Sequence, residues 1–269
     1  MPGKLNHLKM KKILFPLLIM LFFACTKTDQ ETPTDNPTLG WDNVVYQPAL
    51  TSVIATNGQN VLVRGSHPID AQGNFVYDQI LSVVTTKIPS IDFSNHTLID
   101  VTMIGGKATG EWAQLKQELQ AFGLADTAVP AAWPPYTVGY VATLLGTNVC
   151  GHSGKFCYWP IQGFNPSMPM EQKVGQFFTN NGYNGQPGGY NFDGLVSLLD
   201  SLLKDNTSRK IIYYHCTFGH DRTGALTFSW LVKFGGYSKA LAIAKVDSIF
   251  IPNEHYMGMI NDYYTWLFP

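Results

Sequence analysis

The stretch KIIYYHCTFGHDRTG, from Lys210 to Gly224, decides the fold of this chain. It begins with an apolar run, Ile211 to Tyr214, that is typical of a strand buried on both faces of a partly parallel sheet. A short loop of small and polar residues follows, and Arg222 opens a segment with helical periodicity. This order points the loop's N–H groups and the positive end of the helix dipole at one small volume. The stretch therefore predicts a loop that binds an oxyanion.

Cys216 at the strand end and Arg222 at the helix start predict the chemistry of this loop. The amides, the dipole and Arg222 together favour a thiolate at Cys216, which is a good nucleophile for phosphorus. The planar guanidinium of Arg222 can hold two phosphate oxygens. We expect Thr223 to hydrogen-bond the sulfur, and Gly224 to let the helix pack closely against the loop. The remaining loop residues, which would surround the phosphate, are Thr217, Phe218, Gly219, His220 and Asp221.

The segment HCTFGHDRTG, from His215 to Gly224, resembles the signature of the cysteine-dependent protein tyrosine phosphatase superfamily, which is His, Cys, five residues, Arg, then Ser or Thr. The Asp before the Arg is similar to the bacterial tyrosine and phosphoinositide phosphatases with HCxxGKDRTG, and to the myotubularin-type lipid phosphatases. The resemblance implies hydrolysis of phosphate monoesters through a phosphocysteine, without a metal or other cofactor. It also implies that His215 supports the loop and that Arg64, in LVRGSHP, lies near the substrate. A core histidine and a solvated arginine are the plainer alternatives.

The general acid is where the sequence departs from the family. Many members carry an Asp on a loop about thirty residues before the Cys, opposite the nucleophile. The matching segment here is GYNGQPGGYNF, which puts Tyr183 at the acid position, and a phenol is a poor acid for this task. Asp221, inside the loop, is the favoured acid. Asp193 is the alternative, although it can equally be a charge that serves a helix N-terminus.

His220 is a second departure, because it stands where the most similar bacterial phosphatases carry Lys. Histidine supplies a positive charge only at mildly acidic pH. If His220 faces the pocket, we expect anion binding to tighten as the pH falls.

The rest of the chain predicts one α/β domain. Its 269 residues, of which 45% are hydrophobic, suffice for a sizeable core. Strands and helices alternate and a helical part follows, so we expect a central, mostly parallel sheet flanked by helices, as in protein tyrosine phosphatases. The predicted strands are 60–64, 97–102, 136–145, 157–161 and 211–214, and the predicted helices are 111–122, 191–203, 222–234, 238–250 and 253–267.

The N-terminus predicts export. Four lysines precede the apolar run ILFPLLIMLFFA, and the chain turns polar directly after Cys25. Residues 1–25 thus read as a signal peptide ending in a lipobox cysteine, and a plain secretory signal is the alternative. Residues 26–40 are rich in Thr, Asp and Pro and predict a disordered tether, which leaves 41–269 as the phosphatase domain. We expect a periplasmic or outer-membrane lipoprotein, held to the membrane by its lipid.

The cysteines and the charge add two expectations. Cys150 and Cys157 lie close together in an exported protein, which favours a disulfide over a metal site that uses His152. Cys216 is then left unpaired, which suits a nucleophile. A formal net charge of -1 offers no argument for a nucleic-acid partner.

Several functions fit these features. Phosphotyrosine or dual-specificity hydrolysis on protein comes first, and hydrolysis of phosphoinositides or inositol phosphates is the close second. The tyrosine at position 183 leaves open a phosphate-binding pseudophosphatase without turnover. A surface interaction lipoprotein that uses the aromatic tail 252–269 is the third alternative.

Overall fold

A central sheet organises the part of the chain that the computed structural model describes, residues 44–107, 109–130, 143–161, 167–179, 181–185, 191–249 and 252–269. The predicted signal peptide with Cys25 and the predicted tether lie outside these residues. The sheet has seven strands in the order β1-β2-β7-β3-β6-β4, and β5 pairs with β6. Strands β2, β7, β3 and β6 are mutually parallel. The strands are β1 (Ser52–Asn57), β2 (Asn60–Gly65), β3 (Thr97–Thr102), β4 (Leu144–Leu145), β5 (Asn148–Val149), β6 (His152–Tyr158) and β7 (Lys210–His215).

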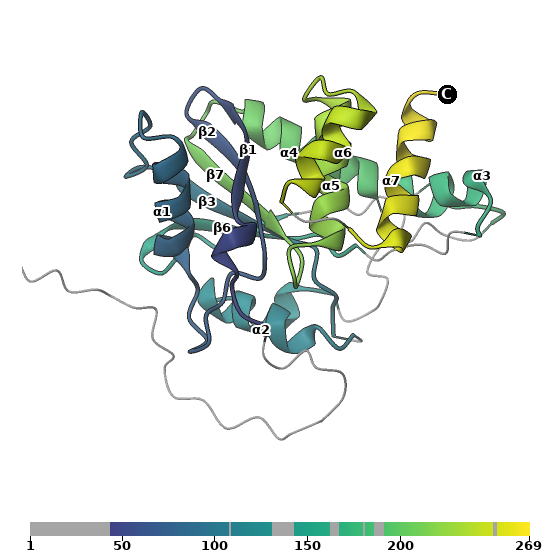
Figure 1. Cartoon of the computed structure of the whole chain (residues 1–269). Coiled ribbons are helices and arrows are strands. Elements are labelled where there is room, and N and C mark those ends of the chain that lie inside the picture. The colour runs from purple at the N-terminus through teal and green to yellow at the C-terminus, as the bar shows by residue number, and fades with distance from the viewer. Residues whose placement is uncertain are drawn as a thin grey trace, which may run out of the picture.

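Helices cover both faces of the sheet, as the α/β prediction expects (Figure 1). Helices α1 (Tyr77–Lys87) and α2 (Trp112–Ala121) pack on one face. Helices α4 (Phe192–Lys204) and α5 (Asp221–Lys233) pack on the other. The smaller helical elements are η1 (Pro48–Leu50), η2 (Asp126–Ala128), α3 (Met170–Lys173) and η3 (Val174–Phe178).

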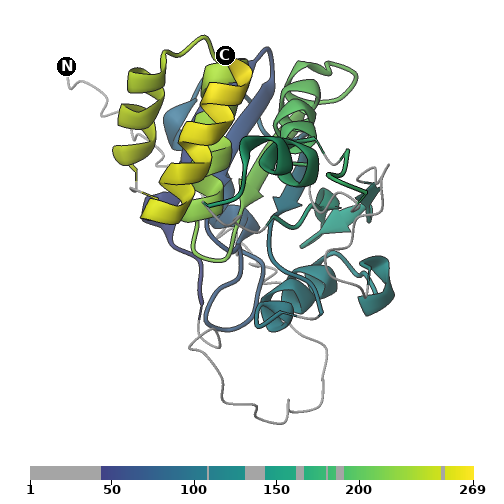
Figure 2. The same ribbon diagram turned by 90° about the vertical axis from the view of Figure 1, so that its right-hand side faces the viewer.

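The C-terminal helices complete the second layer. Helices α6 (Lys239–Asp247) and α7 (Glu254–Leu267) both pack against α5, and Figure 2 shows the yellow α7 beside it. Met259, Ile260 and Tyr263 of α7 are at most 1% exposed. These side chains belong to the core, whereas Phe268 near the end of the tail is 51% exposed.

Helix caps explain why the helix starts could be predicted. The Asn191 side chain accepts a hydrogen bond from the Gly194 N–H at the start of α4. Ser238 and Asn253 cap α6 and α7 in the same way. Each cap satisfies an N–H that would otherwise lack a partner in the first helical turn.

Two predicted strand boundaries need correction, and two elements were missed. The strand predicted at 157–161 instead spans His152–Tyr158. The prediction missed its first half because that part lies near the sheet edge and carries polar side chains. Of the strand predicted at 136–145, the structure describes only Leu144–Leu145. Strand β1 and helix α1 were not predicted. Helix α1 is rich in β-branched residues, which lowers its helix propensity, and burial of an apolar stripe outweighs that.

The predicted disulfide between Cys150 and Cys157 is wrong. Cys157 is a free, buried thiol. Cys150 therefore has no bond to Cys157. The two side chains pack in the hydrophobic clusters on opposite faces of the sheet, so closeness in sequence does not bring them together. His152, the rival metal ligand, stacks on Tyr77 with ring centroids 4.0 Å apart.

Membrane insertion of the described part through its helices finds no support. None of the helices among the described residues combines the length and the apolar character needed to cross a bilayer.

Candidate functional site

The predicted strand, loop and helix are present, and they place Cys216 at the loop's start. Strand β7 ends at His215 and helix α5 begins at Asp221. Cys216 is 2% exposed. The Thr223 hydroxyl donates a hydrogen bond to Sγ of Cys216 at 3.2 Å, and the Cys216 N–H donates to that hydroxyl at 2.9 Å. Thr223 thus connects the first turn of α5 to the sulfur, as the sequence predicts.

The end of β2 shapes the middle of the loop. Gly219 has φ +72°, a left-handed conformation, and a Cβ there would lie 2.7 Å from the Gly65 carbonyl oxygen. The His67 N–H donates to the Thr217 carbonyl at 3.2 Å. Because the loop lies directly on the β2 backbone, position 219 has room only for glycine.

Gly224 packs closely, but not against the loop. A Cβ at this position would lie 2.7 Å from Cγ of Pro252 and 3.4 Å from Val246. The sequence interpretation named the wrong neighbour: the glycine lets α5 approach the segment between α6 and α7.

Arg222 is held beside Cys216 by a carboxylate that the sequence interpretation missed. Both terminal nitrogens of Arg222 contact the carboxylate of Glu111, and Nη1 also donates to the Met103 carbonyl at 2.9 Å. Glu111 accepts further hydrogen bonds from the Thr217 hydroxyl and, at 2.7 Å, from the Gly105 N–H. These contacts fix the plane of the guanidinium next to the loop.

The pair of Arg222 and Glu111 stays charged although it is buried. Burial disfavours the charged guanidinium, but the carboxylate beside it outweighs this and raises the pKa of Arg222. Burial likewise opposes the carboxylate, and Arg222 holds the pKa of Glu111 below its ordinary value. No sequence signal pointed to this role, because an acidic residue next to a helix start is common.

His215 belongs to a buried polar cluster behind the loop. Its Nδ1 lies 3.3 Å from the Cys216 carbonyl oxygen, and its Nε2 lies 3.1 Å from Oδ1 of Asp100 and 3.6 Å from Oε2 of Glu118. His67 Nε2 lies 3.1 Å from Oε1 of Glu118. Burial raises the pKa of the Glu118 carboxyl well above its ordinary value. The sequence anticipated a supporting role for His215 but none of its three neighbours.

Arg64 is a buried cation under the loop rather than a solvated arginine. Its side chain is 0% exposed, and Nη2 donates to the Gly219 carbonyl at 2.7 Å. Nε and Nη1 have no hydrogen-bond partner among the described residues. Burial lowers the pKa of Arg64, while the phenol of Tyr214 and the thiol of Cys216 interact with it in the opposite direction. Arg64 therefore supports the loop from below at a cost in desolvation.

Replacing Arg64 is expected to change stability and activity in opposite directions. We expect Arg64→Met to raise the free energy of unfolding by about 1–3 kcal/mol, because an incompletely paired buried charge is removed. The same change is expected to lower kcat/KM by about tenfold or more, since the positive charge beside Cys216 and the bond to Gly219 are lost. Thermal unfolding and phosphatase kinetics check both effects. Arg64→Lys keeps the charge and is the matched control; equal activity loss in both variants would count against a role for the charge.

The two predicted acids both have structural partners. Asp221 accepts hydrogen bonds from the backbone and side-chain nitrogens of Asn253, at 2.8 and 3.0 Å, and so connects α5 to the cap of α7. Asp193 pairs with Lys233 and accepts a hydrogen bond from the Tyr263 hydroxyl at 2.6 Å. Within the described residues neither carboxylate has a hydrogen bond to the loop residues 216–220. The acid role of Asp221 stays a prediction.

The segment that aligns with the family's acid loop is described only in part. Tyr183 lies within 181–185, and 186–190 fall outside the described residues. The described part is held to η3 by a backbone hydrogen bond, in which the Gly182 N–H donates to the Gly175 carbonyl at 2.8 Å.

Phe218 and His220 form the outer part of the loop. Phe218 is 37% exposed, and its ring is nearly parallel to that of His220, with centroids 6.4 Å apart. Burial and, to a smaller extent, the charge of Arg64 lower the pKa of His220, against an opposing effect of Asp221. His220 therefore gains a positive charge only at a pH below the usual histidine range.

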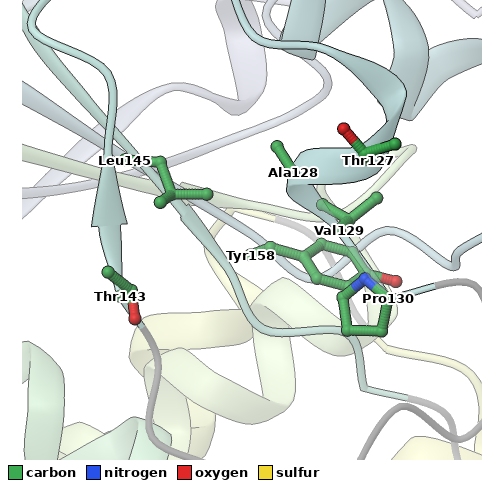
Figure 3. Close-up of a pocket in the computed structure, with 7 residues that line it drawn as sticks. All are labelled: Thr127, Ala128, Val129, Pro130, Thr143, Leu145 and Tyr158. Atoms are coloured by element: carbon green, nitrogen blue, oxygen red, sulfur yellow. The ribbon is translucent and has the colours of Figure 1, made fainter.

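A separate pocket of about 350 Å³ lies between η2 and β4, with Tyr158 in its wall (Figure 3). None of the residues that line it belongs to the loop or contacts Cys216. Its walls adjoin 131–142, outside the described residues, so we assign it no role.

Comparisons with known proteins give only structural neighbours. No family model and no curated protein sequence matches the chain. Human DUSP28 aligns at 10% identity with a TM-score of 0.36, covering 80% of this chain and 94% of that one. A mouse putative dual specificity phosphatase aligns at 12% identity with a TM-score of 0.35, covering 89% and 94%.

A third neighbour is a PTP-like phytase from Bdellovibrio bacteriovorus, at 10% identity and a TM-score of 0.37, with 89% of this chain and 92% of that one covered. These neighbours are consistently tyrosine or dual-specificity phosphatases, or are named as similar to them. Because their identities and TM-scores are low, we derive the function from the site itself.

Proposed function

We propose that this chain hydrolyses phosphate monoesters with Cys216 as the nucleophile. One observation carries the proposal: the thiol, the Thr223 hydroxyl that donates to it and the Arg222 guanidinium held by Glu111 meet at the N-terminus of α5. A helix N-terminus and an arginine beside a cysteine favour a phosphate dianion in the pocket. A thiol there is placed to attack it.

The reaction would proceed in two displacements. In the first, the Cys216 sulfur forms a bond to phosphorus, the ester P–O bond breaks, and the leaving oxygen takes a proton from an acid. In the second, water attacks phosphorus while the conjugate base of that acid takes its proton, the S–P bond breaks to return the thiolate, and inorganic phosphate leaves. Arg222 stabilises the charge on the transferring phosphoryl group in both steps. The Thr223 hydroxyl stabilises the sulfur as it leaves in the second step.

We propose Asp221 as the acid, and two variants separate this role from its contact with α7. If Asp221 donates the proton, Asp221→Asn should lower kcat about a hundredfold for a phosphotyrosine peptide and much less for p-nitrophenyl phosphate, whose leaving group needs no proton. Asn253→Ala keeps the carboxyl but removes a cap worth about 1 kcal/mol, so it should lower stability and keep the wild-type leaving-group dependence. Equal losses for both substrates in Asp221→Asn would assign the residue to structure alone.

The proposed substrate is a phosphorylated protein, with phosphotyrosine or dual specificity. Phe218, 37% exposed on the loop, offers an apolar surface to an aryl group next to the phosphate. A phosphoinositide or inositol phosphate is the second candidate. The charge at His220 distinguishes the two substrate classes, because a positive charge there strengthens binding of a ligand with an additional phosphate.

Replacing His220 by Lys tests the charge at this position. Since the folded-state pKa of His220 is lowered, the wild type should gain charge only well below neutral pH. We therefore expect the ratio of wild-type to His220→Lys affinity for inositol hexakisphosphate to rise as the pH falls from about 7 to about 5. Because both variants bind the same ligand at each pH, the ratio removes the pH dependence that comes from protonation of the ligand. A ratio that stays constant over this range would place His220 outside the pocket.

Phosphate release from p-nitrophenyl phosphate, without added metal and under reducing conditions, tests the proposed function. The wild type should turn over, and Cys216→Ser should be reduced to background while still binding vanadate. Rapid acid quench with a phosphorus-labelled substrate should trap label on the wild type only. A reduced wild type that binds vanadate without turnover between about pH 5 and pH 8 would instead be a phosphate-binding module.

We propose further that the chain is an exported lipoprotein with Cys25 as the lipidated residue. Support comes from the sequence of 1–25 alone. Labelling of cells with a radioactive fatty acid tests it: label should enter the wild type and be lost in Cys25→Ser. Labelling of both, or of neither, would contradict the proposal.

A further inference from the structure

A buried group of metal-ligand residues lies behind the catalytic loop, on the face of the sheet opposite Cys216. Asp100 of β3 and His215 of β7 each lie two positions from an apolar residue that faces α1 and α2, Leu98 and Tyr213, and so point to the same face. Glu118 lies next to them on α2, a helix that packs on the same face of the sheet. All three side chains are 0% exposed. Three elements therefore bring two carboxylates and an imidazole together without solvent.

The three side chains place their ligand atoms close together without well-aligned hydrogen bonds between them. One ligand atom from each residue lies within 4.8 Å of the others. His215 Nε2 is 3.1 Å from Asp100 and 3.6 Å from Glu118, yet these contacts are not aligned as hydrogen bonds. Within the described residues, none of the four carboxylate oxygens accepts a well-aligned hydrogen bond, although the Thr102 hydroxyl lies near Glu118 and His215 lies near Asp100. Buried polar atoms are normally well paired, so these carboxylates point to a bound cation.

The tautomer of His215 leaves Nε2 available to bind a cation. Nδ1 lies 3.3 Å from the Cys216 carbonyl oxygen, which can only accept, so Nδ1 carries the proton. In a neutral ring, Nε2 would then point a lone pair toward two carboxylates. Metal-ligating histidines commonly donate their other N–H to a backbone carbonyl in this way. A lone pair and two buried carboxylates need a positive charge between them.

The distances suit a small divalent ion. In a tetrahedral site with bonds of about 2.0–2.2 Å, neighbouring ligand atoms lie about 3.3–3.6 Å apart. The separations of 3.1 and 3.6 Å around His215 are close to these values. An imidazole with two carboxylates suits zinc, iron or manganese better than calcium or magnesium, which prefer oxygen donors alone.

We propose that Asp100, Glu118 and His215 bind one divalent transition-metal ion, zinc being the best match. His67 serves as an outer partner: its Nε2 lies 3.1 Å from Glu118 and 3.2 Å from the Gln114 carbonyl oxygen. The ion is structural, since a site without solvent contact leaves no position for substrate. It joins β3, β7 and α2 directly behind the loop. The sequence pointed to no metal because these ligands lie far apart along the chain.

Metal analysis of the purified full chain tests the proposal. Protein from cultures supplemented with zinc, iron or manganese, purified without chelators, should contain about one metal ion per chain. Asp100→Asn and Glu118→Gln keep the size of each side chain and should each lower the metal content at least fivefold. Asp200→Asn is the matched control, because Asp200 is a buried carboxylate, 7% exposed, that pairs with Lys204 elsewhere. It should retain the metal.

A second measurement covers variants that fail to fold. Wild type unfolded in denaturant should release its metal to a chromogenic chelator, and cobalt-grown protein should show the visible absorption of a low-symmetry site with oxygen and nitrogen ligands. A chelator should lower the thermal midpoint of the wild type, because an ion that binds only the folded state stabilises it. These readouts do not depend on turnover, so they are separate from the test of the phosphatase proposal.

Two results would overturn the metal assignment. One is a folded wild type with almost no metal from any of these cultures and a thermal midpoint that neither metal nor chelator changes. Protons shared among the carboxylates and imidazoles would then hold the cluster together. The other is bound metal that persists unchanged in folded Asp100→Asn and Glu118→Gln.

Discussion

Arg222→Lys is expected to lower kcat/KM for aryl phosphates about a thousandfold, although the positive charge is kept. Arg222 contacts Glu111 through two nitrogens and also donates to the Met103 carbonyl. An ammonium group has no planar fork, so it cannot hold Glu111 and two phosphate oxygens at fixed angles at the same time. Steady-state kinetics with p-nitrophenyl phosphate and vanadate affinity measure the loss.

Two further variants show whether the loss comes from geometry. Glu111→Gln leaves the guanidinium but removes the charge that orients it, so we expect a smaller loss, about tenfold. Arg209→Lys is the matched control, because Arg209 is exposed and should tolerate the change without effect. If Arg222→Lys keeps more than a tenth of the wild-type activity, the bidentate role of Arg222 is wrong.

Gly219→Ala is expected to destabilise the fold by about 3 kcal/mol and to abolish most turnover. Part of the cost is the left-handed backbone, with φ +72°. The larger part is steric, because the new Cβ would lie 2.7 Å from the Gly65 carbonyl oxygen and 2.9 Å from the Ser66 Cα, both backbone atoms at the end of β2. The loop must move away from β2, which also breaks the bond from Arg64. Denaturant unfolding and kcat/KM measure the two effects.

Gly236 supplies the matched control. It has φ +73°, and a Cβ there would meet nothing within 4 Å. Gly236→Ala should therefore cost only about 1 kcal/mol and leave kcat/KM unchanged. A Gly219→Ala variant that is no less stable and no less active than Gly236→Ala would contradict the close packing of the loop on β2.

Local signals account for what could be predicted from sequence. The run from Ile211 to Tyr214, the polar loop and the periodicity after Arg222 specify a strand, a turn and a helix through nearest neighbours alone. Asn191, Ser238 and Asn253 mark helix starts because a cap acts within one turn. Cys216 and Arg222 could be related for the same reason, because one short loop connects them. These features depend on residues that are close along the chain.

The features that the sequence left undecided depend on contacts across the sheet. Glu111 meets Arg222, and Asp100 and Glu118 meet His215, only because parallel strands and α2 bring distant segments to one edge. Cys150 and Cys157 are seven positions apart, yet Cys150 lies in the turn between β5 and β6, and the two side chains pack in clusters on opposite faces of the sheet. The sequence by itself determined the loop that holds Cys216 and Arg222 and the order of the elements. The tertiary structure alone decided which buried charges surround them, because charge pairing inside a protein is set by packing and not by spacing.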